Sequence, residues 1–367
     1  MMKSTAAAPE ALVEAVLDPR TLRDLDLPAW EALLACARRN AVLAYLAHRA
    51  EAANVIDDLP PAPRTAMRSA RTAAARLAQL ARFELDRVRR VLQPPGIPLI
   101  ALKGAAYLLR GMPHASTRIM SDVDVMVPRE RIDAAERVLV ESGWKGTKLD
   151  PYDQAYYRRW SHEIPPLQYP GRLLAVDVHH TIVPPVSRLK PDPEAFWADA
   201  TASAIDGIVL LSPVDSLLHA AVHLFFDSDF DGRFRDLVDV HEMFVSFGAA
   251  PGFWDALIVR ARAQGLTRPL YYACATSSRV LRTAIPADVI EALRHHAPPL
   301  PVDAWMTHTL ATLLSPADAT RWPPANRGRL WLMYVRSHWL RMPPHLLVPH
   351  LVRKSLRRSR LAPAADA

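Results

Sequence analysis

The stretch from Arg118 to Pro128, RIMSDVDVMVP, places two aspartates one residue apart at the start of an apolar segment. The valines and methionine that follow are typical of a buried strand. Because side chains alternate along a strand, Asp122 and Asp124 point to one face while Val123 and Val125 point to the other. Two like charges held so close repel each other, so we expect a metal ion, an arginine or a proton to neutralise them.

The composition of the chain is that of a globular protein. Its 367 residues are enough for two or three domains or one large composite fold, and half of them are apolar, which supplies a substantial core. The two cysteines, Cys36 and Cys274, lie far apart in helix-like apolar contexts. This arrangement indicates neither a metal-binding spacing nor a disulfide framework, and it favours a reducing, cytoplasmic location.

The charge distribution indicates neither a membrane protein nor a nucleic-acid-binding protein. Pro9 and Glu10 interrupt the N-terminal stretch before any hydrophobic run develops, and no run of about 18 uncharged apolar residues follows. We therefore expect no signal peptide and no membrane span. The net charge of +7 owes much to the tail HLVRKSLRRSR, His350 to Arg360. Such a moderate excess does not by itself indicate nucleic acid as a partner.

The pattern of apolar residues divides the chain into three regions. Residues 1–94 and 213–367 carry apolar residues at three- and four-residue intervals, which predicts helices, and the second of these regions ends in the basic tail. Residues 95–212 alternate short strands and helices. The expected strands lie in PPGIPLIALKG (94–104), DVDVMVP (122–128), EIPPLQY (163–169), RLLAVDVHHTIV (172–183) and AIDGIVLLSP (204–213). The sequence thus predicts an α+β (mixed α/β) fold, a small mixed sheet flanked by N- and C-terminal helical regions.

Three further residues in the middle of the chain indicate phosphate and metal chemistry. Asp177 is an acid within an otherwise apolar strand, and a buried acid needs a partner. If that strand lies beside the first, three carboxylates meet at one sheet edge, the oxygen-rich arrangement that Mg²⁺ prefers when phosphates supply further ligands. Lys103 and Gly104 end a strand where a helix begins, so backbone N–H groups and an ammonium group can receive phosphate oxygens.

These motifs resemble those of a known family. LKG ending at Gly104, an arginine followed by SDVDVMV, and VDVHH at a third strand are similar to the uncharacterised nucleotidyltransferase family of the DNA polymerase β-like nucleotidyltransferase superfamily. The resemblance covers the region from Ile97 to Val183. It extends more weakly to LSPVDSLLHAAVHLFF and RFRDLVDVHEMF in the C-terminal helical region.

The resemblance implies a nucleotidyltransferase-like core with an acid-x-acid pair and a third acid that together bind two Mg²⁺ ions. The implied metal ligands and catalytic acids are Asp122, Asp124 and Asp177. The residues we expect to contact the nucleotide are Lys103, Gly104, Arg118, Ser121 and His179. Ala105 stands where many superfamily members have serine, so a hydroxyl contact to the phosphates is absent, and we expect Lys103 to supply a contact instead.

Each of the acids also has a structural interpretation. Asp122 can cap the turn at the strand entry, with Asp124 paired to Arg118, and Arg118 is either a phosphate clamp or the partner of Asp122. Asp177 can pair with Arg172. The order in which LKG, the aspartate pair and Asp177 follow one another favours the metal site. In that case Asp124→Asn should leave the melting temperature of the metal-free protein unchanged or slightly raised.

The fourteen histidines raise the question of zinc. His219 and His223 lie one helical turn apart, a spacing that can bind zinc, but the residues between them include no catalytic glutamate. Polar contact at a helix interface is the favoured role for this pair. His179 shares a strand face with Asp177, so it is either a contact to nucleotide or acceptor, or a structural side chain.

Two features of the C-terminal region have modest interpretations. Arg235 and Asp239 stand four residues apart, which a surface ion pair on a helix explains. Trp322, Trp331 and Trp339 precede the arginine run, and we expect a closing helix that packs these aromatic side chains inward. A membrane-surface or partner-binding helix is the alternative.

The sequence as a whole predicts a Mg²⁺- or Mn²⁺-dependent enzyme that moves a nucleoside monophosphate from an NTP to an acceptor, with pyrophosphate leaving. Kinase-like phosphoryl transfer and non-catalytic nucleotide binding are the alternatives. The acceptor, whether small molecule, peptide or protein, is not specified, and nucleic acid is not indicated. We expect loops such as TKLDPYDQAYYRRWSHE, Thr147 to Glu163, to select the acceptor.

Overall fold

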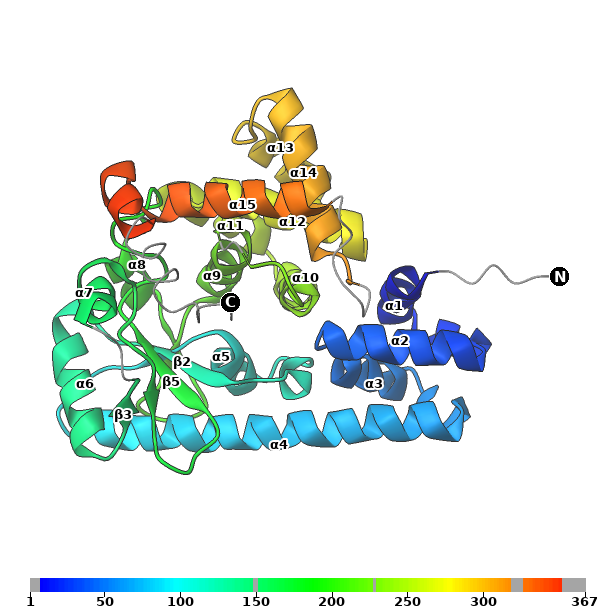
Figure 1. Cartoon of the computed structure of the whole chain (residues 1–367), viewed down its shortest axis with the longest axis horizontal. Helices are drawn as coiled ribbons and strands as arrows, with labels where there is room; N and C mark the ends of the chain where they lie inside the picture. Colours follow the sequence, from blue (N-terminus) through cyan, green and yellow to red (C-terminus); the bar gives the residue numbers. More distant parts are fainter. Residues whose placement is uncertain (1–6, 148–150, 227–228, 318–325, 352–367) are drawn as a thin grey trace, which may run out of the picture.

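A computed structural model describes residues 7–147, 151–226, 229–317 and 326–351 of the chain. The N-terminal region is helical, as predicted. Its α-helices are α1 (Ala8–Leu17), α2 (Leu27–Arg39), α3 (Leu43–Ala52) and α4 (Pro61–Leu92), with 3-10 turns η1 (Pro19–Asp24) and η2 (Ile56–Asp58). The 32 residues of α4 run along one side of the molecule, under α3, α5 and the sheet (Figure 1).

The length of α4 follows from its sequence. Pro61 opens the helix, where the missing N–H costs no hydrogen bond, and the helix then contains no glycine and no proline beyond its first turn. Alanine, leucine and arginine, which dominate its composition, are strong helix formers. Buried residues from Met67 to Leu92 recur at three-, four- and seven-residue intervals and turn one stripe of the helix toward the core.

A seven-stranded mixed sheet lies in the centre, with strand order β3-β4-β5-β2-β1-β7-β6. The strands are β1 (Ile100–Ala101), β2 (Asp122–Met126), β3 (Lys145–Gly146), β4 (Leu167–Gln168), β5 (Ala175–His179), β6 (Thr201–Ala202) and β7 (Val209–Leu210). The pairs β2–β5 and β1–β7 are parallel, and the other pairs are antiparallel. The predicted α+β fold class, with a small mixed sheet and flanking helices, is confirmed.

Helices of the central region connect and cover the strands. They are α5 (Lys103–Arg110), α6 (Ile132–Glu141), α7 (Pro151–Trp160) and α8 (Pro193–Ala198), with 3-10 turns η3 (Ala115–Thr117) and η4 (Arg129–Arg131). The prediction that Thr147 to Glu163 forms a loop is wrong, because the helix α7 occupies most of this segment. Tyr152, Tyr156 and Trp160 recur every four residues, and their rings pack edge to face along one side of the helix. Residues 148–150 of that segment lie outside the described residues.

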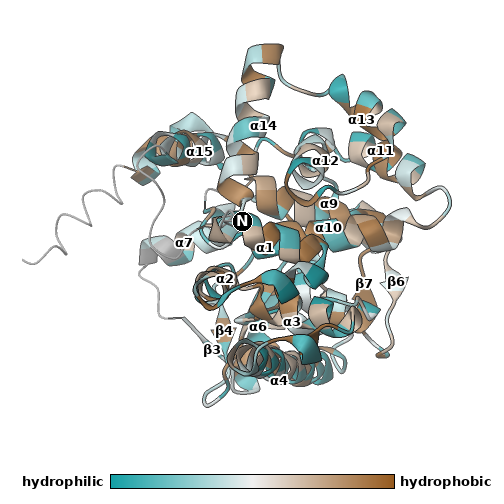
Figure 2. Ribbon diagram, turned by 90° about the vertical axis from the view of Figure 1, so that its right-hand side faces the viewer, coloured by the Kyte–Doolittle hydropathy of each residue, from teal (hydrophilic) through white to brown (hydrophobic). Residues whose placement is uncertain are grey.

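The C-terminal region is helical, as predicted. Its helices are α9 (Pro213–Phe226), α10 (Phe234–Gly248), α11 (Phe253–Ala263), α12 (Thr267–Leu281), α13 (Ala287–Arg294), α14 (Leu300–Leu314) and α15 (Asn326–Arg341). Apolar residues concentrate around α9 and α10, while the outward faces of α2 and α4 are hydrophilic (Figure 2). Buried apolar residues from Leu12 to Met333 form one continuous core. The boundaries after residues 94 and 212 stay predictions.

The expectation that the C-terminal tryptophans pack inward is wrong for two of them. Trp331 is 63% exposed and Trp339 is 49% exposed on α15. The reason is that α15 contacts the rest of the protein along a narrow stripe centred on the fully buried Met333 and Ser337. Trp322 and most of the basic tail lie outside the described residues. Among the helices that the structure describes, none combines the length and the apolar character that crossing a bilayer requires.

Candidate active site

The parallel pairing of β2 and β5 brings the three predicted acids onto one sheet face. Asp124 stands opposite Asp177 in the register, and Asp122 stands opposite Ala175. Directly opposed residues of neighbouring strands share a face, and so do residues two apart on one strand. Asp122, Asp124 and Asp177 therefore lie on the same face, together with His179, which is two residues beyond Asp177.

Two basic side chains neutralise Asp124. Its Oδ1 atom lies 2.6 Å from Lys103 Nζ and accepts a hydrogen bond of 3.0 Å from His179 Nε2. Burial alone would raise the pKa of this carboxyl, but the Lys103 charge and the two hydrogen bonds hold it well below its usual range. The repulsion inferred from the sequence is thus resolved by a lysine and a histidine. The structural alternative in which Arg118 pairs with Asp122 or Asp124 is wrong, because the ion pairs of Arg118 are with Asp236 and Asp239.

The backbone at the start of α5 places Lys103 on Asp124. Lys103 has a φ of 44°, a left-handed value that side chains other than glycine rarely adopt. A Cβ atom on the next residue, Gly104, would lie 2.9 Å from Met120 Sδ and 3.5 Å from Arg118 Cδ. Glycine at this position therefore lets the first turn of α5 approach the segment that leads into β2. Lys103 is therefore not a solvated side chain at the strand end, since it is 19% exposed and paired with Asp124.

Asp177 has no cationic partner of its own among the described residues. Burial, followed by repulsion from Asp124 and Glu163, raises its pKa to about 7. Its Oδ1 atom is buried and has no hydrogen-bond partner among the described residues. The expected pairing with Arg172 is wrong, because Arg172 lies 3.0 Å from Glu84 instead. A buried carboxylate oxygen that lacks a hydrogen-bond partner can bind a metal cation from solution.

Arg118 is held by two acids of α10. Its Nη1 lies 2.6 Å from Asp239 Oδ2 and its Nη2 lies 3.2 Å from Asp236 Oδ1. Asp236 is also 2.6 Å from Arg233 and 3.1 Å from Arg235. Although burial raises the pKa of Asp236, the surrounding arginines lower it well below its usual range. The predicted surface pair of Arg235 and Asp239 is wrong, because Asp239 is buried and bonded to Arg118.

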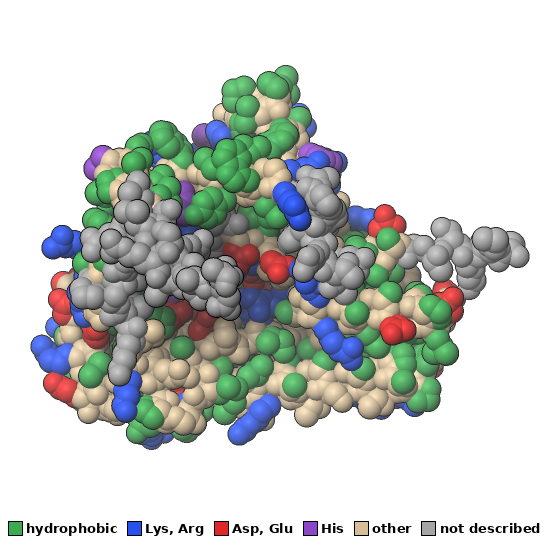
Figure 3. Space-filling view, viewed as in Figure 1, with side chains coloured by type: hydrophobic (Ala, Val, Ile, Leu, Met, Phe, Trp, Pro, Cys, Tyr) green, Lys and Arg blue, Asp and Glu red, His purple; other side chains and the backbone are tan. Residues whose placement is uncertain are grey.

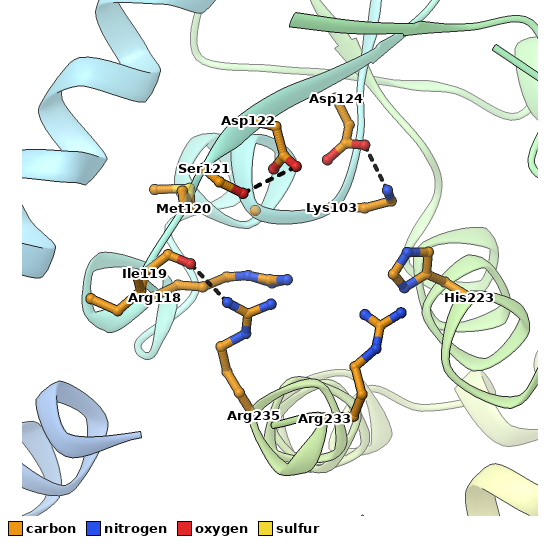
Figure 4. Close-up of a pocket in the computed structure, with 11 residues that line it drawn as sticks. Lys103, Arg118, Ile119, Met120, Ser121, Asp122, Asp124, His223, Arg233 and Arg235 are labelled. Carbon is orange, nitrogen blue, oxygen red and sulfur yellow. Dashed lines mark hydrogen bonds and ion pairs between the residues drawn. The ribbon is translucent and has the colours of Figure 1, made fainter. Parts of the chain in front are cut away.

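A cavity of about 230 Å³ lies between β2, α5 and α10, and Asp177 and His179 are not among its lining residues (Figure 4). Its lining residues are Lys103, Gly104, Arg118, Ile119, Met120, Ser121, Asp122, Asp124, His223, Arg233 and Arg235. Acidic side chains and basic side chains meet in a hollow in the middle of the molecular face seen in Figure 3. Asp122 accepts a 3.2 Å hydrogen bond from Ser121 Oγ at the cavity wall. Four basic side chains thus converge on a cavity that also contains two carboxylates.

Comparison with protein families agrees with this geometry. The model of a family described as uncharacterised nucleotidyltransferase matches residues 26–282, from the start of α2 to the end of α12. The chain belongs to this family. Membership indicates nucleotidyltransferase activity in general and confirms the resemblance that the sequence motifs carry. Searches among curated proteins and among solved structures gave no significant match.

The three aspartates do not form a ready-made metal cluster in the metal-free chain. Among the described residues, one group of histidine, cysteine or acidic side chains has all its ligand atoms within 4.8 Å of one another, and it consists of His162, Glu163 and His179. The three aspartates do not meet this distance criterion. Lys103, moreover, is already paired with Oδ1 of Asp124. Their oxygen-only donor set and the unpartnered oxygen of Asp177 nevertheless fit Mg²⁺.

His219 and His223, one turn apart on α9, have no third metal ligand near them among the described residues. His219 is buried, and burial lowers its pKa to about 3. The ring centroids of His219 and His223 lie 6.5 Å apart, and the pair belongs to no ligand group of three. His223 lines the cavity instead. The interpretation as polar side chains at a helix interface is the better one for His219.

Sequence reasoning missed several residues of the site. Arg233 and Arg235 were not among the candidates for phosphate contact, although both line the cavity from α10. Asp236 and Asp239 lie on the same helix stripe as Met243, because the three residues are spaced by three and four. That periodicity was a signal of burial, and two buried acids on one stripe predict a buried basic partner such as Arg118.

Proposed function

We propose that this nucleotidyltransferase is Mg²⁺-dependent and transfers a nucleoside monophosphate from an NTP to an acceptor that contains a hydroxyl, phosphate or amine group. The observation that carries the proposal is the register of β2 and β5, which places Asp177 opposite Asp124. Asp122 lies two residues before Asp124 on the same face of β2, and the cavity next to this pair is rich in basic side chains. Carboxylates provide metal ligands and arginines provide phosphate contacts, and this site combines both.

The cavity supports an interaction with the phosphate groups of the NTP. Its volume of about 230 Å³ is below the range of about 300 to 1,000 Å³ that is usual for complete small-molecule pockets. We therefore assign it to the triphosphate, with the nucleoside lying outside it. Arg233 and Arg235 line the cavity from α10, and the N-terminal turn of α5 begins at its wall with Lys103 and Gly104.

The acids have distinct roles in this proposal. Asp122 and Asp124 would hold one metal ion with the triphosphate, and Asp177 would join them for a second ion near the acceptor. When bound, Mg²⁺ supplies positive charge for the phosphate oxygens and lowers the pKa of the acceptor group. Asp177 would also receive the acceptor's proton, because its buried Oδ1 has no hydrogen-bond partner among the described residues.

Lys103 would change partner during the cycle. In the metal-free protein its ammonium group neutralises Asp124, and its pKa is raised because this ion pair outweighs the effect of burial. While Lys103 is paired with Oδ1 of Asp124, this oxygen is not available as a metal ligand. We propose that Lys103 moves to a phosphate oxygen when metal-bound NTP arrives, while His179 continues to donate its hydrogen bond to Asp124 Oδ1.

The proposal is tested by measuring which labelled phosphate of the NTP is transferred to an acceptor. Purified protein is incubated with Mg²⁺, a cell extract and each NTP, labelled either at the α-phosphate or at the γ-phosphate. Nucleotidyl transfer moves the α-label to an acceptor and releases pyrophosphate, and the reaction is absent in Asp122→Asn. Transfer of the γ-label instead would establish phosphoryl transfer, and binding without any transfer would support a non-catalytic nucleotide-binding protein.

A further inference from the structure

A group of ligand-type side chains lies next to the proposed Mg²⁺ site but outside its cavity. His162, Glu163 and His179 place one ligand atom each within 4.8 Å of one another. Glu163 and His179 stand opposite each other in an antiparallel bridge, so their side chains share a face. Backbone hydrogen bonds from His180 N to His162 O (2.9 Å) and from Ile164 N to Val178 O (3.0 Å) fix this segment against β5.

The distances within the group are close to those of a metal site. Glu163 Oε2 lies 3.5 Å from His179 Nδ1 and 3.8 Å from His162 Nε2. These contacts are longer than hydrogen bonds. With metal–ligand distances of about 2.0 to 2.2 Å, the ligand atoms of a tetrahedral zinc ion lie about 3.3 to 3.5 Å apart. Small rotations of side chains that are 26% (His162) and 22% (Glu163) exposed would therefore close the group around an ion.

His179 supplies an independent indication of a ligand. The residue is 1% exposed, and its buried Nδ1 has no hydrogen-bond partner in the part of the chain that the structure describes. Its other nitrogen, Nε2, is bonded to the carboxylate of Asp124 at 3.0 Å. A metal-binding histidine typically donates its second N–H to a carboxylate, which fixes the tautomer and leaves the first nitrogen's lone pair for the metal. His179 shows this arrangement, with Nδ1 facing Glu163.

We propose that His162, Glu163 and His179 form a binding site for one divalent transition metal ion of the Zn²⁺ type, separate from the Mg²⁺ site proposed on the aspartates. Two imidazole nitrogens and one carboxylate oxygen are a donor set for zinc rather than for Mg²⁺. Three protein ligands leave a fourth position open. The ion would position Asp124 through His179, because it keeps the Nε2 proton directed at that carboxylate.

Zinc binding to the full-length protein tests the proposal. The protein is treated with a chelator, dialysed, and titrated with Zn²⁺ in the presence of excess Mg²⁺, and bound zinc is measured by calorimetry and by elemental analysis. We expect one equivalent of bound zinc. Glu163→Gln and His162→Gln should each weaken binding more than about 100-fold, since each removes a direct ligand. His295→Gln, which changes an exposed histidine at the C-terminal end of α13, is the matched control.

Two further measurements separate this site from the nucleotide site and from misfolding. Asp122→Asn should abolish the effect of Mg²⁺ and NTP on melting temperature while it leaves the zinc stoichiometry unchanged, so the two proposals can fail independently. Circular dichroism checks that each ligand variant is folded. Absence of zinc binding in the wild-type protein, or equal binding in the ligand variants and in His295→Gln, would overturn the proposal and leave His179 as a hydrogen-bond partner of Asp124 that lies near Glu163.

Discussion

Lys103 Nζ lies 2.6 Å from Asp124 Oδ1, so the residue that the sequence suggested for phosphate contact instead neutralises one of the acids suggested for metal binding. Asp124 is 5% exposed, and the pair is therefore largely shielded from water. A pair of this kind costs desolvation energy, and removal of either partner leaves a buried charge. The stability of the metal-free protein and the binding of metal and nucleotide should consequently depend on the same two side chains.

Lys103→Met should destabilise the metal-free protein by about 2 to 4 kcal/mol. Loss of one partner from a buried ion pair costs about 3 to 5 kcal/mol, and the partial exposure of Lys103 reduces this value. NTP affinity should fall about tenfold, since one charge-assisted contact is lost. Mg²⁺ without NTP should raise the melting temperature more than in the wild type, because no ammonium group competes for Asp124.

The measurements for this variant are urea denaturation and thermal shift with Mg²⁺, NTP or both. Lys145→Met, which changes an exposed lysine on β3, serves as the control and should behave like the wild type. If Lys103→Met kept both its stability and its NTP affinity, the lysine would have neither of the roles given to it here.

Asp122→Asn and Asp124→Asn should lose activity alike but differ in stability. Both remove a proposed metal ligand, so the transfer rate should fall by about 10³-fold or more. Asp124→Asn should also lower the melting temperature of the metal-free protein, because Lys103 and His179 lose their charged partner. This prediction differs from the expectation from sequence, which rested on repulsion between Asp122 and Asp124, because Asp124 is paired with Lys103 and His179. Asp122, bonded to the adjacent Ser121, should change stability little.

Transfer assays and calorimetry on the two variants in parallel provide the test. An active Asp122→Asn protein would remove the aspartate pair from the catalytic machinery. Equal melting temperatures for both variants would show that the Lys103–Asp124 pair contributes nothing measurable to the metal-free fold.

Much of this site followed from local sequence pattern. A two-residue period identified β2 and β5, and the shared face of Asp122 and Asp124 follows from that period alone. The position of Asp177 opposite Asp124 follows only if β2 pairs with β5. More than fifty residues separate the two aspartates, and local sequence pattern does not predict which distant strands pair. The family resemblance supplied that step.

The partners of the charged residues could not be read from the sequence. Arg118 is bonded to Asp236 and Asp239, more than a hundred positions later, because α10 packs across the cavity from β2. The helix formed by Tyr152 to Trp160 was also missed, since its aromatic stripe is short and its hydrophobicity is low. Local periodicity thus predicted elements and faces, while ion pairs between distant elements depended on packing that only the structure gives.

Stability of the metal-free protein should decline between about pH 4 and pH 7 because of Asp177. The ordinary pKa of this carboxyl is 3.8, which applies to the unfolded chain, and in the folded protein it is raised to about 7. Between these values the folded state binds more protons than the unfolded state, so raising the pH favours unfolding. The contribution is fully present below about pH 4 and is lost once the pH passes 7.

Asp177→Asn removes this dependence. Its melting temperature should exceed that of the wild type at pH 8 and approach it at pH 4.5, as measured by thermal denaturation without metal. Asp255→Asn, on the exposed side of α11, is the control and should show no such trend. A constant difference between Asp177→Asn and the wild type across this pH range would contradict the raised pKa.

Arg235→Gln and Arg118→Met should separate nucleotide binding from structural support. Arg235 is 25% exposed at the cavity and donates to Ile119 O at 2.8 Å, so its loss should weaken binding of NTP or pyrophosphate about tenfold with a small change in stability. Arg118 is 10% exposed, and Arg118→Met leaves Asp239 buried without its cation. That variant should lose about 3 to 5 kcal/mol of stability.

A double-mutant cycle decides whether the Arg118–Asp239 pair carries this difference. If the cost of Arg118→Met arises from the uncompensated charge of Asp239, then Arg118→Met combined with Asp239→Asn should be more stable than Arg118→Met alone, because no buried carboxylate remains unpaired. Additive losses in urea denaturation would mean that the two side chains act independently, and Arg118 would then be free to serve as the phosphate clamp that its position at the cavity also allows. Pyrophosphate titration of the same variants measures that second role directly.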